Sequence, residues 1–477
     1  MKILFAGSEA VPFASTGGLG DVIGSLPAAL AETYPDCDVR VVIPLYGDIT
    51  RQYRDAMELC CTTEVRLAWR TQYCGIYELK RSGVTFYFID NEYYFKRPAL
   101  YGSYDDGERF AFFGRCILEL MDRLDYFPDI LHCNDWQSAA AVLYLRTLYS
   151  NDDRYRDIRA VYTIHNIEYQ GVYGADILGD VFGLGSNIRG IIEYDGDINL
   201  TKGAIVCADA VTTVSPRYAE EIQTEFYSHG LYHILRLYRD KVSGIINGID
   251  TDYYNPETDD MIIKNYSAKA YSGKRECKTD LQRLTGLPEN PDTPVVAMIS
   301  RLAKHKGFDL VRRVIEEYLY DDVQFVLLGT GEREYEDYFS NLARRYPAKA
   351  ACLLQFNKQL AKKIYAGADM FLMPSQSEPC GLSQMIASRY GAVPIVRETG
   401  GLFDTIKPYN EYTGEGNGFT FANYNAHEML GVLRYATTVY RDKKSWNALM
   451  RKCMKCDFTW ARSAERYMEL YNKIKSY

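Results

Sequence analysis

The sequence predicts an α/β protein made of two doubly wound domains, each built on a parallel sheet that helices cover on both faces. Short apolar, β-branched runs alternate along the chain with amphipathic stretches of helical period, which is the pattern of such sheets. A chain of 477 residues is also too long for one ordinary hydrophobic core. The apolar runs form two series, and we place the domain boundary near residue 243.

The first series predicts the strands of an N-terminal domain over residues 1–243. Its apolar runs occupy residues 3–6, 39–43, 85–89, 130–132, 160–164 and 211–214. Helical patterns lie between them, for example over residues 21–34 and 109–124. Gly, Pro or polar residues bound each run, as expected where a buried strand ends.

The second series predicts a C-terminal domain over residues 244–456. Its runs begin near Val242 and occupy residues 242–246, 295–299, 323–328, 370–373 and 393–396. Residues 257–293 are polar and contain several Gly, Pro and Asp residues, so we expect a long surface excursion there. Ligands of such sheets bind beyond the carboxyl ends of the strands, so the loops after strands are where we look for chemistry.

Composition limits the class of protein. Hydrophobic residues make up 47% and charged residues 25% of the chain, which is typical of a soluble globular protein. The net charge of −8 provides no general basic field for nucleic acid or an acidic membrane. No run approaches the roughly 18 apolar residues that would span a bilayer. Ser8 and Glu9 follow the first apolar run too soon for a signal peptide, so we expect a cytoplasmic protein.

The cysteines do not favour a metal or redox site. The chain has 12 of them, scattered along its length, and we expect reduced thiols. Cys453 and Cys456 form a single CxxC motif with no second pair. We therefore expect no metal site.

The first candidate loop is rich in glycine and runs from Ser15 to Asp21, at the start of a predicted helix. Glycines let backbone N–H groups approach an anion, and a helix N-terminus adds partial positive charge. A dinucleotide-binding loop is the competing interpretation. It is disfavoured because Ile23 stands where its third glycine would be, and because no acidic residue follows the next strand.

Three further loops follow predicted strands. The loop after residues 160–164 begins with His165, and its polar cluster favours a site over a structural histidine. Arg301 and Lys306 follow residues 295–299, where a diphosphate could accept both cations. Glu378 lies in a turn before a predicted helix, and its carboxylate could bind hydroxyls or a developing cation. Cys380 nearby is only a weak candidate nucleophile, because no histidine lies near it in the sequence, and a small buried thiol is the favoured interpretation.

These motifs together resemble those of the bacterial glycogen synthases and plant starch synthases, over the chain from Met1 to the final helix. The matching segments, in the order found in that family, are Thr16-Gly-Gly-Leu-Gly-Asp-Val22, Asp106-Gly-Glu-Arg-Phe110, His132-Cys-Asn-Asp-Trp-Gln137, His165-Asn-Ile-Glu-Tyr-Gln-Gly171, Asn247-Gly-Ile-Asp250, Arg301-Leu-Ala-Lys-His-Lys-Gly307, Glu378-Pro-Cys-Gly-Leu382 and Thr399-Gly-Gly-Leu402.

The resemblance implies a GT-B glycosyltransferase, with two Rossmann-like domains that face each other across a cleft. It implies transfer of glucose from ADP-glucose to the non-reducing 4-hydroxyl of an α-1,4-glucan in glycogen biosynthesis, with retention at the anomeric carbon. It implies no metal and no other cofactor. The family's last helix crosses back to the first domain, and residues 457–477 are similar to it.

The resemblance also implies roles for individual residues. Arg301 and Lys306 match the pair that neutralises the donor diphosphate, and Glu378 matches a carboxylate beside the sugar. Asp21 and His165 complete the implied catalytic set. The implied substrate-binding residues are Gly17 and Gly18 of the glycine-rich loop, Asn166, Asn247, Phe356 as a stack for adenine, Cys380, Gly381 and Leu382 as sugar and phosphate contacts, and Asp135 and Trp136 on the acceptor side.

One departure from the family concerns the glycine-rich loop. The usual pattern begins Lys-x-Gly-Gly, and this chain has Ser15 in place of the lysine. The change removes a cation near the donor and puts donor affinity and nucleotide selection in question. Three alternatives therefore stay open: a related transferase that uses UDP-glucose or builds another α-glucan, a catalytically weak glucan-binding scaffold, and, least favoured, an NAD-linked oxidoreductase.

Overall fold

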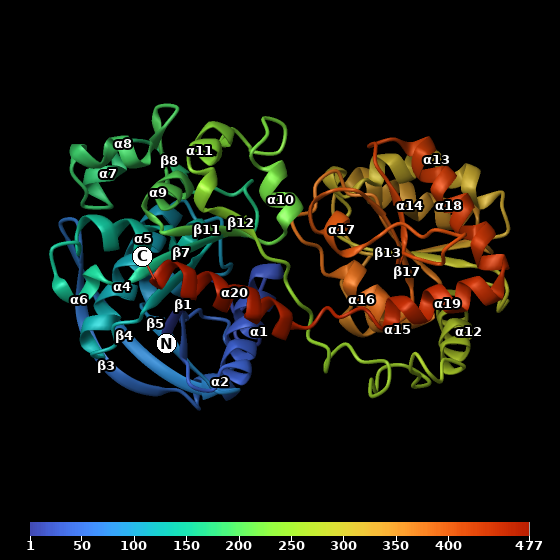
Figure 1. Cartoon of the computed structure of the whole chain (residues 1–477), viewed down its shortest axis with the longest axis horizontal. Coiled ribbons are helices and arrows are strands. Elements are labelled where there is room, and N and C mark those ends of the chain that lie inside the picture. The colour runs from blue at the N-terminus through green and yellow to red at the C-terminus, as the bar shows by residue number, and fades with distance from the viewer. Residues whose placement is uncertain (477) are drawn as a thin grey trace. The chain divides into compact units, whose positions relative to one another are not determined.

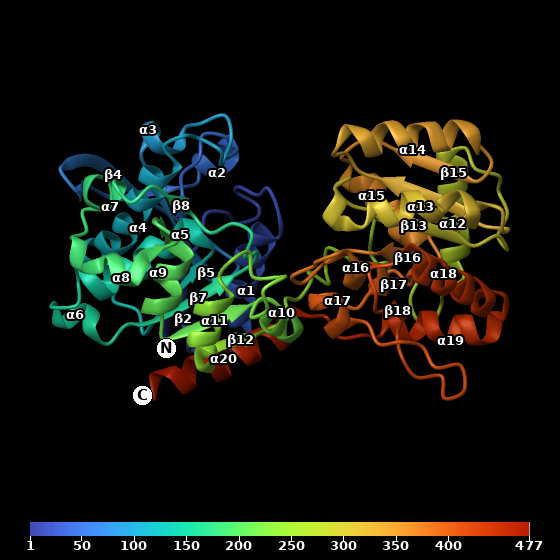
Figure 2. The same cartoon turned by 90° about the horizontal axis from the view of Figure 1, so that it is seen from above.

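The computed structural model describes residues 1–476, which form two compact units (Figure 1). Unit 1 comprises Met1–Gly248 and the C-terminal segment that begins at Trp460, and unit 2 comprises Ile249–Thr459. Each unit contains a largely parallel sheet with helices on both faces, as the two views show (Figures 1 and 2). The predicted fold class is confirmed.

The sheet of unit 1 has nine strands. It is parallel from β12 to β5 and antiparallel over β4 and β3. In spatial order the strands are β12 (Val242–Gly244), β11 (Ala210–Thr213), β7 (Arg159–Ile164), β6 (Ile130–Asn134), β1 (Lys2–Ala6), β2 (Asp38–Pro44), β5 (Val84–Asp90), β4 (Arg70–Arg81) and β3 (Glu58–Leu67).

Two features of this sheet differ from the sequence prediction. The run at Val242, which we assigned to the second series, pairs with β11 in unit 1. The hairpin of β3 and β4 was not predicted, because most of its residues are exposed or half-buried and it contains no continuous apolar run. An antiparallel edge can face solvent on one side, whereas the buried parallel strands are continuously apolar.

Helices complete unit 1. The long ones are α1 (Gly18–Thr33), α4 (Asp106–Arg123), α5 (Trp136–Thr147), α9 (Leu200–Cys207) and α20 (Trp460–Lys475). The short ones are α2 (Arg51–Arg54), α3 (Glu92–Phe95), α6 (Asp153–Arg156), α7 (Ile177–Asp180), α8 (Arg189–Ile192), α10 (Pro216–Glu221) and α11 (Tyr232–Leu237). A small sheet of β8 (Val172–Tyr173), β10 (Asp197–Asn199) and β9 (Glu193–Tyr194) lies beside them.

Helix α20 returns to unit 1 and packs beside α1 (Figure 1). The hydroxyl of Tyr471 lies 2.7 Å from Nδ1 of His132, and Nε2 of His132 lies 2.6 Å from the hydroxyl of Thr163. All three side chains are completely buried. The C-terminal helix is therefore bonded to the centre of the N-terminal sheet.

Unit 2 contains a six-stranded parallel sheet, with helices on both faces (Figure 2). In spatial order the strands are β15 (Ala350–Leu353), β14 (Gln324–Leu328), β13 (Val295–Ile299), β16 (Met370–Met373), β17 (Val393–Arg397) and β18 (Phe419–Phe421). The helices are α12 (Gly273–Thr285), α13 (Phe308–Leu319), α14 (Arg333–Arg345), α15 (Lys358–Gly367), α16 (Ser383–Arg389), α17 (Gly400–Thr405), α18 (Ala426–Arg441) and α19 (Lys443–Met454).

The predicted surface excursion over residues 257–293 is in part wrong, because it contains helix α12. Lys274 and Lys278 lie on the buried side of this helix. Nζ of Lys278 forms an ion pair with Asp369 at 2.7 Å. Burying a lysine is unfavourable unless it is paired, so the polar composition here reflects buried ion pairs as well as exposed loop.

Candidate active site

In unit 1 the predicted residues other than Asn247 gather at the carboxyl ends of three neighbouring strands. The glycine-rich loop follows β1, Asp135 and Trp136 follow β6, and His165 and Asn166 follow β7. Parallel strands that are adjacent in the sheet bring these loops together. Gly17, Gly18 and Asp21, at the start of α1, are exposed.

Asp135 adopts an uncommon backbone conformation between β6 and α5. Its φ is 56° and its ψ is 175°, a region in which residues other than glycine are strained. Its Oδ1 accepts a hydrogen bond from the amide of His165 at 2.7 Å. Burial raises the pKa of Asp135 to about 7, although the amides of His165 and Asn166 oppose that rise. The carboxylate is therefore tied to the next loop and titrates near neutral pH.

His165 is a neutral imidazole with a defined tautomer. Burial lowers its pKa to about 3. Nε2 lies 3.0 Å from Oδ1 of Asn134, while the amide nitrogen of Asn134 donates to the carbonyls of Ala6 and His132. Because Asn134 offers only an acceptor to the ring, Nε2 carries the proton and Nδ1 is left as an acceptor.

Trp136 is buried at the start of α5 and contacts the rings of Phe110 and Tyr173. It forms part of the wall of an open pocket of about 510 Å³. The pocket is lined by Trp136, Glu168, Tyr169, Gln170, Gly171, Val172 and His229. Its mixture of flat aromatic and hydrogen-bonding groups suits a polyhydroxylated ligand.

Asn166 and Asn247 differ in how their side chains are used. Oδ1 of Asn166 accepts a hydrogen bond from the amide of Glu168 and so stabilises its own loop. Asn247 follows β12 and is 6% exposed, and its Oδ1 has no hydrogen-bond partner within residues 1–476. A buried amide oxygen without a donor is costly, which marks Asn247 as a residue that a ligand could satisfy.

In unit 2 the site centres on Lys306 and Glu378. Nζ of Lys306 donates to Oε1 of Glu378 at 2.9 Å and to Oε2 at 2.7 Å. The hydroxyl of Ser375 donates to Oε2 at 2.9 Å. The Glu378 residue is only 7% exposed. Ion pairing and a neutral donor therefore hold this carboxylate in one orientation at the carboxyl end of the sheet.

Glycines bring the loop of Lys306 and the start of α17 close to the loop of Glu378. Gly307, with φ of 81°, lies so close to Pro374 that an added Cβ would be 2.2 Å from its carbonyl oxygen. Gly400, with φ of 43°, approaches the carbonyl oxygen of Glu378 in the same way, at 2.0 Å. Only glycine allows both the positive φ and the close approach.

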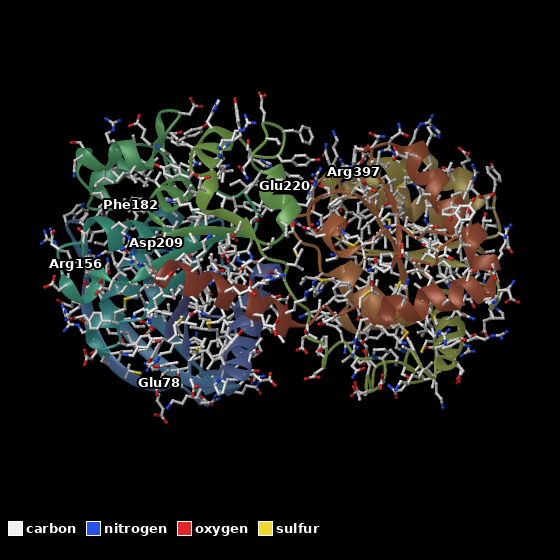
Figure 3. The ribbon with its side chains drawn as sticks, in the orientation of Figure 1. Glu78, Arg156, Phe182, Asp209, Glu220 and Arg397 are labelled. Carbon is white, nitrogen blue, oxygen red and sulfur yellow. The ribbon has the colours of Figure 1, made fainter. Side chains whose placement is uncertain are left out.

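Arg397, labelled in Figure 3, extends the same edge. It ends β17 and donates to the carbonyls of Ser375 and Gln376 at 3.4 and 2.8 Å. Sequence reasoning included Ser375 in a candidate loop without giving it a role, and it did not single out Arg397. The signal available for Arg397 was its position at the end of a strand.

The loop of Cys380, Gly381 and Leu382 is shaped by Gln384. Its side-chain amide donates to the carbonyls of Cys380 and Gly381 at 3.1 and 2.8 Å. Gly381 has φ of 72°, and Leu382 immediately precedes α16. Cys380 is 5% exposed, and such burial does not favour a nucleophilic thiol.

In unit 2 the exposed residues among those predicted for the site are Arg301 and Phe356. Arg301 follows β13, and no ion pair involves its side chain within residues 1–476. Phe356 lies between β15 and α15 and is 84% exposed. An unpaired guanidinium and an uncovered ring are available for an anion and a flat base, respectively.

The clearest residue that sequence reasoning missed is Glu9. It is 3% exposed and accepts hydrogen bonds from the glycine-rich loop. Tyr101, from a distant segment, also donates to it. Two polar residues directly after a buried strand, Ser8 and Glu9, were the signal that could have found it.

Comparison with known proteins assigns the family. Residues 2–237 match the model of the starch synthase catalytic domain, and residues 285–448 match that of glycosyl transferases group 1. The chain belongs to the glycogen and starch synthase family. It is 50% identical to a glycogen synthase of Desulforamulus reducens, over 99% of each chain, and 48% identical to one of Bacillus cereus strain Q1, over 99% of this chain and 100% of the relative.

Solved structures of this family and fold agree with that assignment. The catalytic domain of starch synthase IV from Arabidopsis thaliana, bound to ADP and acarbose, superposes with a TM-score of 0.90 at 34% identity, covering 100% of this chain and 99% of that one. A sucrose-phosphate synthase from Thermosynechococcus elongatus has a TM-score of 0.62 at 16% identity, over 100% and 99% of the chains, which is a similarity of fold. The chain is thus a glycosyltransferase with the GT-B fold. Within residues 1–476 no helix is long and apolar enough to cross a membrane.

Proposed function

We propose that this glycosyltransferase transfers glucose from ADP-glucose to the non-reducing 4-hydroxyl of an α-1,4-glucan, with retention at the anomeric carbon. The observation that carries the proposal is the Lys306–Glu378 pair at the ligand edge of unit 2. Its support is the similarity, over nearly the whole chain, to glycogen synthases and to a starch synthase that was solved with ADP and acarbose. Cytoplasmic localisation stays a prediction from the sequence.

The cations of unit 2 suit the leaving group. Cleavage of the bond between glucose and phosphate puts negative charge on ADP and positive charge on the sugar. A lysine ammonium has three donors, and Glu378 engages Lys306 through two contacts, so one N–H can face a phosphate. Arg301 can add a second cation, and fixed charges of this kind stabilise developing charge without reorganisation.

Other residues suit the sugar and the base. The carboxylate of Glu378, held by Lys306 and Ser375, can accept a hydrogen bond from a sugar hydroxyl or face the developing positive charge on the sugar. In unit 1 the unprotonated Nδ1 of His165 can accept a hydrogen bond from a sugar hydroxyl. We assign Phe356 to adenine stacking and Trp136 to the acceptor glucan.

The test is incorporation of glucose into glycogen with ADP-glucose or UDP-glucose, in the presence of a chelator. We expect incorporation from ADP-glucose to exceed that from UDP-glucose, with an α-linked product by NMR of the new anomeric proton. Incorporation from UDP-glucose alone would overturn the donor assignment. No incorporation from either donor would overturn the proposed function.

Matched variants show whether the activity belongs to this site. Glu378→Gln removes the negative charge of the buried pair. We expect turnover to fall while glycogen binding is retained. Glu289→Gln removes a carboxylate from a surface ion pair with Arg283 in the same unit, and we expect no effect. Equal loss of turnover in both variants would contradict the assignment of Glu378.

A further inference from the structure

The turn of the β3–β4 hairpin presents a tryptophan to solvent. Trp69 stands between the two strands and is 71% exposed. Its Nε1 donates a hydrogen bond to Oδ1 of Asp180, in α7, at 2.7 Å. The turn also meets the residues after α7 at Gly183, where an added Cβ would lie 3.1 Å from Cα of Ala68. The hairpin turn is therefore fixed beside α7 (Figure 2).

An arginine holds the same ring on one face. The guanidinium of Arg70 lies 4.3 Å from the centroid of the Trp69 ring. Arg70 also donates to the carbonyl and to Oδ2 of Asp180, at 2.6 and 3.1 Å. Single exposed aromatic rings are common on protein surfaces, but this ring is fixed by a hydrogen bond and by a cation stacked on it. A ring that is already fixed loses little entropy when a ligand stacks on its other face.

The charges beside the ring are balanced. Arg70 forms ion pairs with Glu108 at 3.3 Å and with Asp180 at 3.1 Å, so its charge is already compensated and would add little to the binding of a phosphate. Hydrogen bonds from Trp69 and Arg70 lower the pKa of Asp180, which keeps this carboxylate ionised. The Asp180 side chain is 57% exposed, and its oxygens can accept further hydrogen bonds. A flat ring beside accessible acceptors suits a neutral sugar.

A second exposed ring is joined to the first through Glu108. Oε1 of Glu108 accepts a hydrogen bond from the hydroxyl of Tyr94 at 2.6 Å. The ring of Tyr94 packs edge-on against that of Tyr93, with centroids 5.0 Å apart. Tyr93 is 60% exposed, and the guanidinium of Arg97 lies 5.4 Å from its centroid. We define the Trp69 surface as Trp69, Arg70, Tyr93 and Asp180.

The first turn of α4 connects the Trp69 surface to the pocket of Trp136. Glu108 lies in that turn and pairs with the arginine that stacks on Trp69. Its neighbour Gly107 lies so close to Tyr173 that an added Cβ would be 3.1 Å from the ring, and Tyr173 contacts Trp136. A polymeric ligand that occupies the pocket can therefore extend towards the Trp69 surface, whereas a single sugar unit cannot.

We propose that the Trp69 surface is an accessory binding site for the acceptor glucan, which it holds outside the pocket of Trp136. The inference rests on the proposed function, because that function supplies a polymer of neutral sugar units as the ligand. Trp69 stacks on the flat face of a glucosyl unit, and Asp180 accepts hydrogen bonds from its hydroxyls. Because a long chain engages two places at once, the site raises the affinity for long glucans without touching the reacting atoms.

The test compares a short acceptor with a long one in Trp69→Ala. Maltotriose is short enough to be held by the pocket alone, whereas glycogen can occupy the pocket and the Trp69 surface together. We expect KM for glycogen to rise by roughly threefold to tenfold, as for the loss of one aromatic stack, while kcat and KM for maltotriose stay within about twofold. An equal rise in KM for both acceptors, or no rise for either, would overturn the proposal.

Binding measured without a donor separates this site from catalysis. Migration through native gels that contain glycogen gives a dissociation constant, which we expect Trp69→Ala to raise by a similar factor. Tyr320→Ala is the matched control, since Tyr320 is 78% exposed at the end of α13 in unit 2, and we expect it to change nothing. An equal loss of glycogen binding in both variants would overturn the proposal. Absence of transfer from any donor would contradict the proposed function, whereas unchanged migration of Trp69→Ala would contradict only the accessory site.

Trp69→Phe distinguishes a binding site from a purely structural role of the ring. The substitution keeps a flat ring and removes the N–H that bonds to Asp180. We expect its dissociation constant for glycogen to lie between those of the unaltered protein and Trp69→Ala. If the ring served only to fasten the hairpin turn, both variants would weaken glycogen binding equally, and that result would overturn the proposal. So would a changed molar mass of Trp69→Ala by light scattering with unchanged glycogen binding, which would identify a second copy of this chain as the occupant.

Discussion

At the scale of the residue, Lys306 and Glu378 act as a unit. Their side chains are 21% and 10% exposed and lie 2.7 Å apart. Because both side chains are largely shielded from solvent, removal of one member leaves the charge of the other without compensation. We therefore expect each residue to affect the site both through contacts of its own with a ligand and through the orientation of its partner.

This pairing predicts a large effect of Lys306→Ala. We expect kcat/KM for ADP-glucose to fall by roughly 10²–10³-fold, because one cation that meets the developing charge of the leaving group is lost. Steady-state kinetics over a range of donor concentration checks the prediction. Unchanged kinetics would remove Lys306 from the site.

A double-mutant cycle tests whether the pair is a unit. The variant that combines Lys306→Ala with Glu378→Gln should show a fold loss in kcat/KM much smaller than the product of the two single losses. The reason is that the effects of substitutions at two residues in direct contact are not additive. Additive losses would mean that Lys306 and Glu378 act independently.

At the scale of the element, glycines decide how closely the loops of unit 2 approach. Gly307 lies between the short 3₁₀ helix Lys304–Lys306 and α13, with φ of 81°. The same residue lies against Pro374, directly before the loop of Ser375 and Glu378. The close approach of Gly307 to Pro374 therefore helps to set the distance between Lys306 and Glu378.

Gly307→Ala should damage both stability and activity. Positive φ alone costs an alanine about 1–2 kcal/mol, and the added Cβ would lie 2.2 Å from the carbonyl oxygen of Pro374. Gly286→Ala is the control, since Gly286 also has positive φ, of 73°, but a Cβ there meets nothing within 4 Å. We expect chemical denaturation to show a loss of about 1–2 kcal/mol for Gly286→Ala with normal activity, and a larger loss with reduced activity for Gly307→Ala. Equal losses would show that the close approach has no energetic consequence.

At the scale of the whole molecule, the chain leaves unit 1 after Gly248 and returns to it at Trp460. Unit 1 is therefore completed only when its C-terminal helix has docked. The buried contacts of Tyr471 with His132, and of His132 with Thr163, link that helix to β6 and β7. Burial lowers the pKa of His132 to about 3, so the ring is neutral and each nitrogen needs a partner.

Tyr471→Phe should weaken unit 1 selectively. It leaves Nδ1 of His132 buried without a partner, which costs about 1–3 kcal/mol. Hydrogen exchange followed by mass spectrometry should show faster exchange in β6 and β7 and unchanged exchange in β13 and β14 of unit 2. Equal acceleration in both units would contradict the view that each unit opens on its own.

The sequence by itself determined the family and most of the parallel strands with the loops that follow them, but not the short strands β15 and β18. A buried parallel strand is a continuous apolar run and is therefore visible locally, as at β1, β7 and β13. The polar groups that function needs then stand directly after such runs, as His165 and Arg301 do. The largely exposed hairpin of β3 and β4 and the helix within residues 257–293 lack that local signal.

Only the tertiary structure decided which residues meet. Lys306 contacts Glu378 across 72 positions, Tyr101 contacts Glu9 across 92, and Tyr471 contacts His132 across 339. Strand order determines these contacts, because it sets which loops are neighbours, and strand order depends on pairing between distant segments. The sequence could therefore name a glycine-rich loop, but the structure was needed to show that its amides face Glu9.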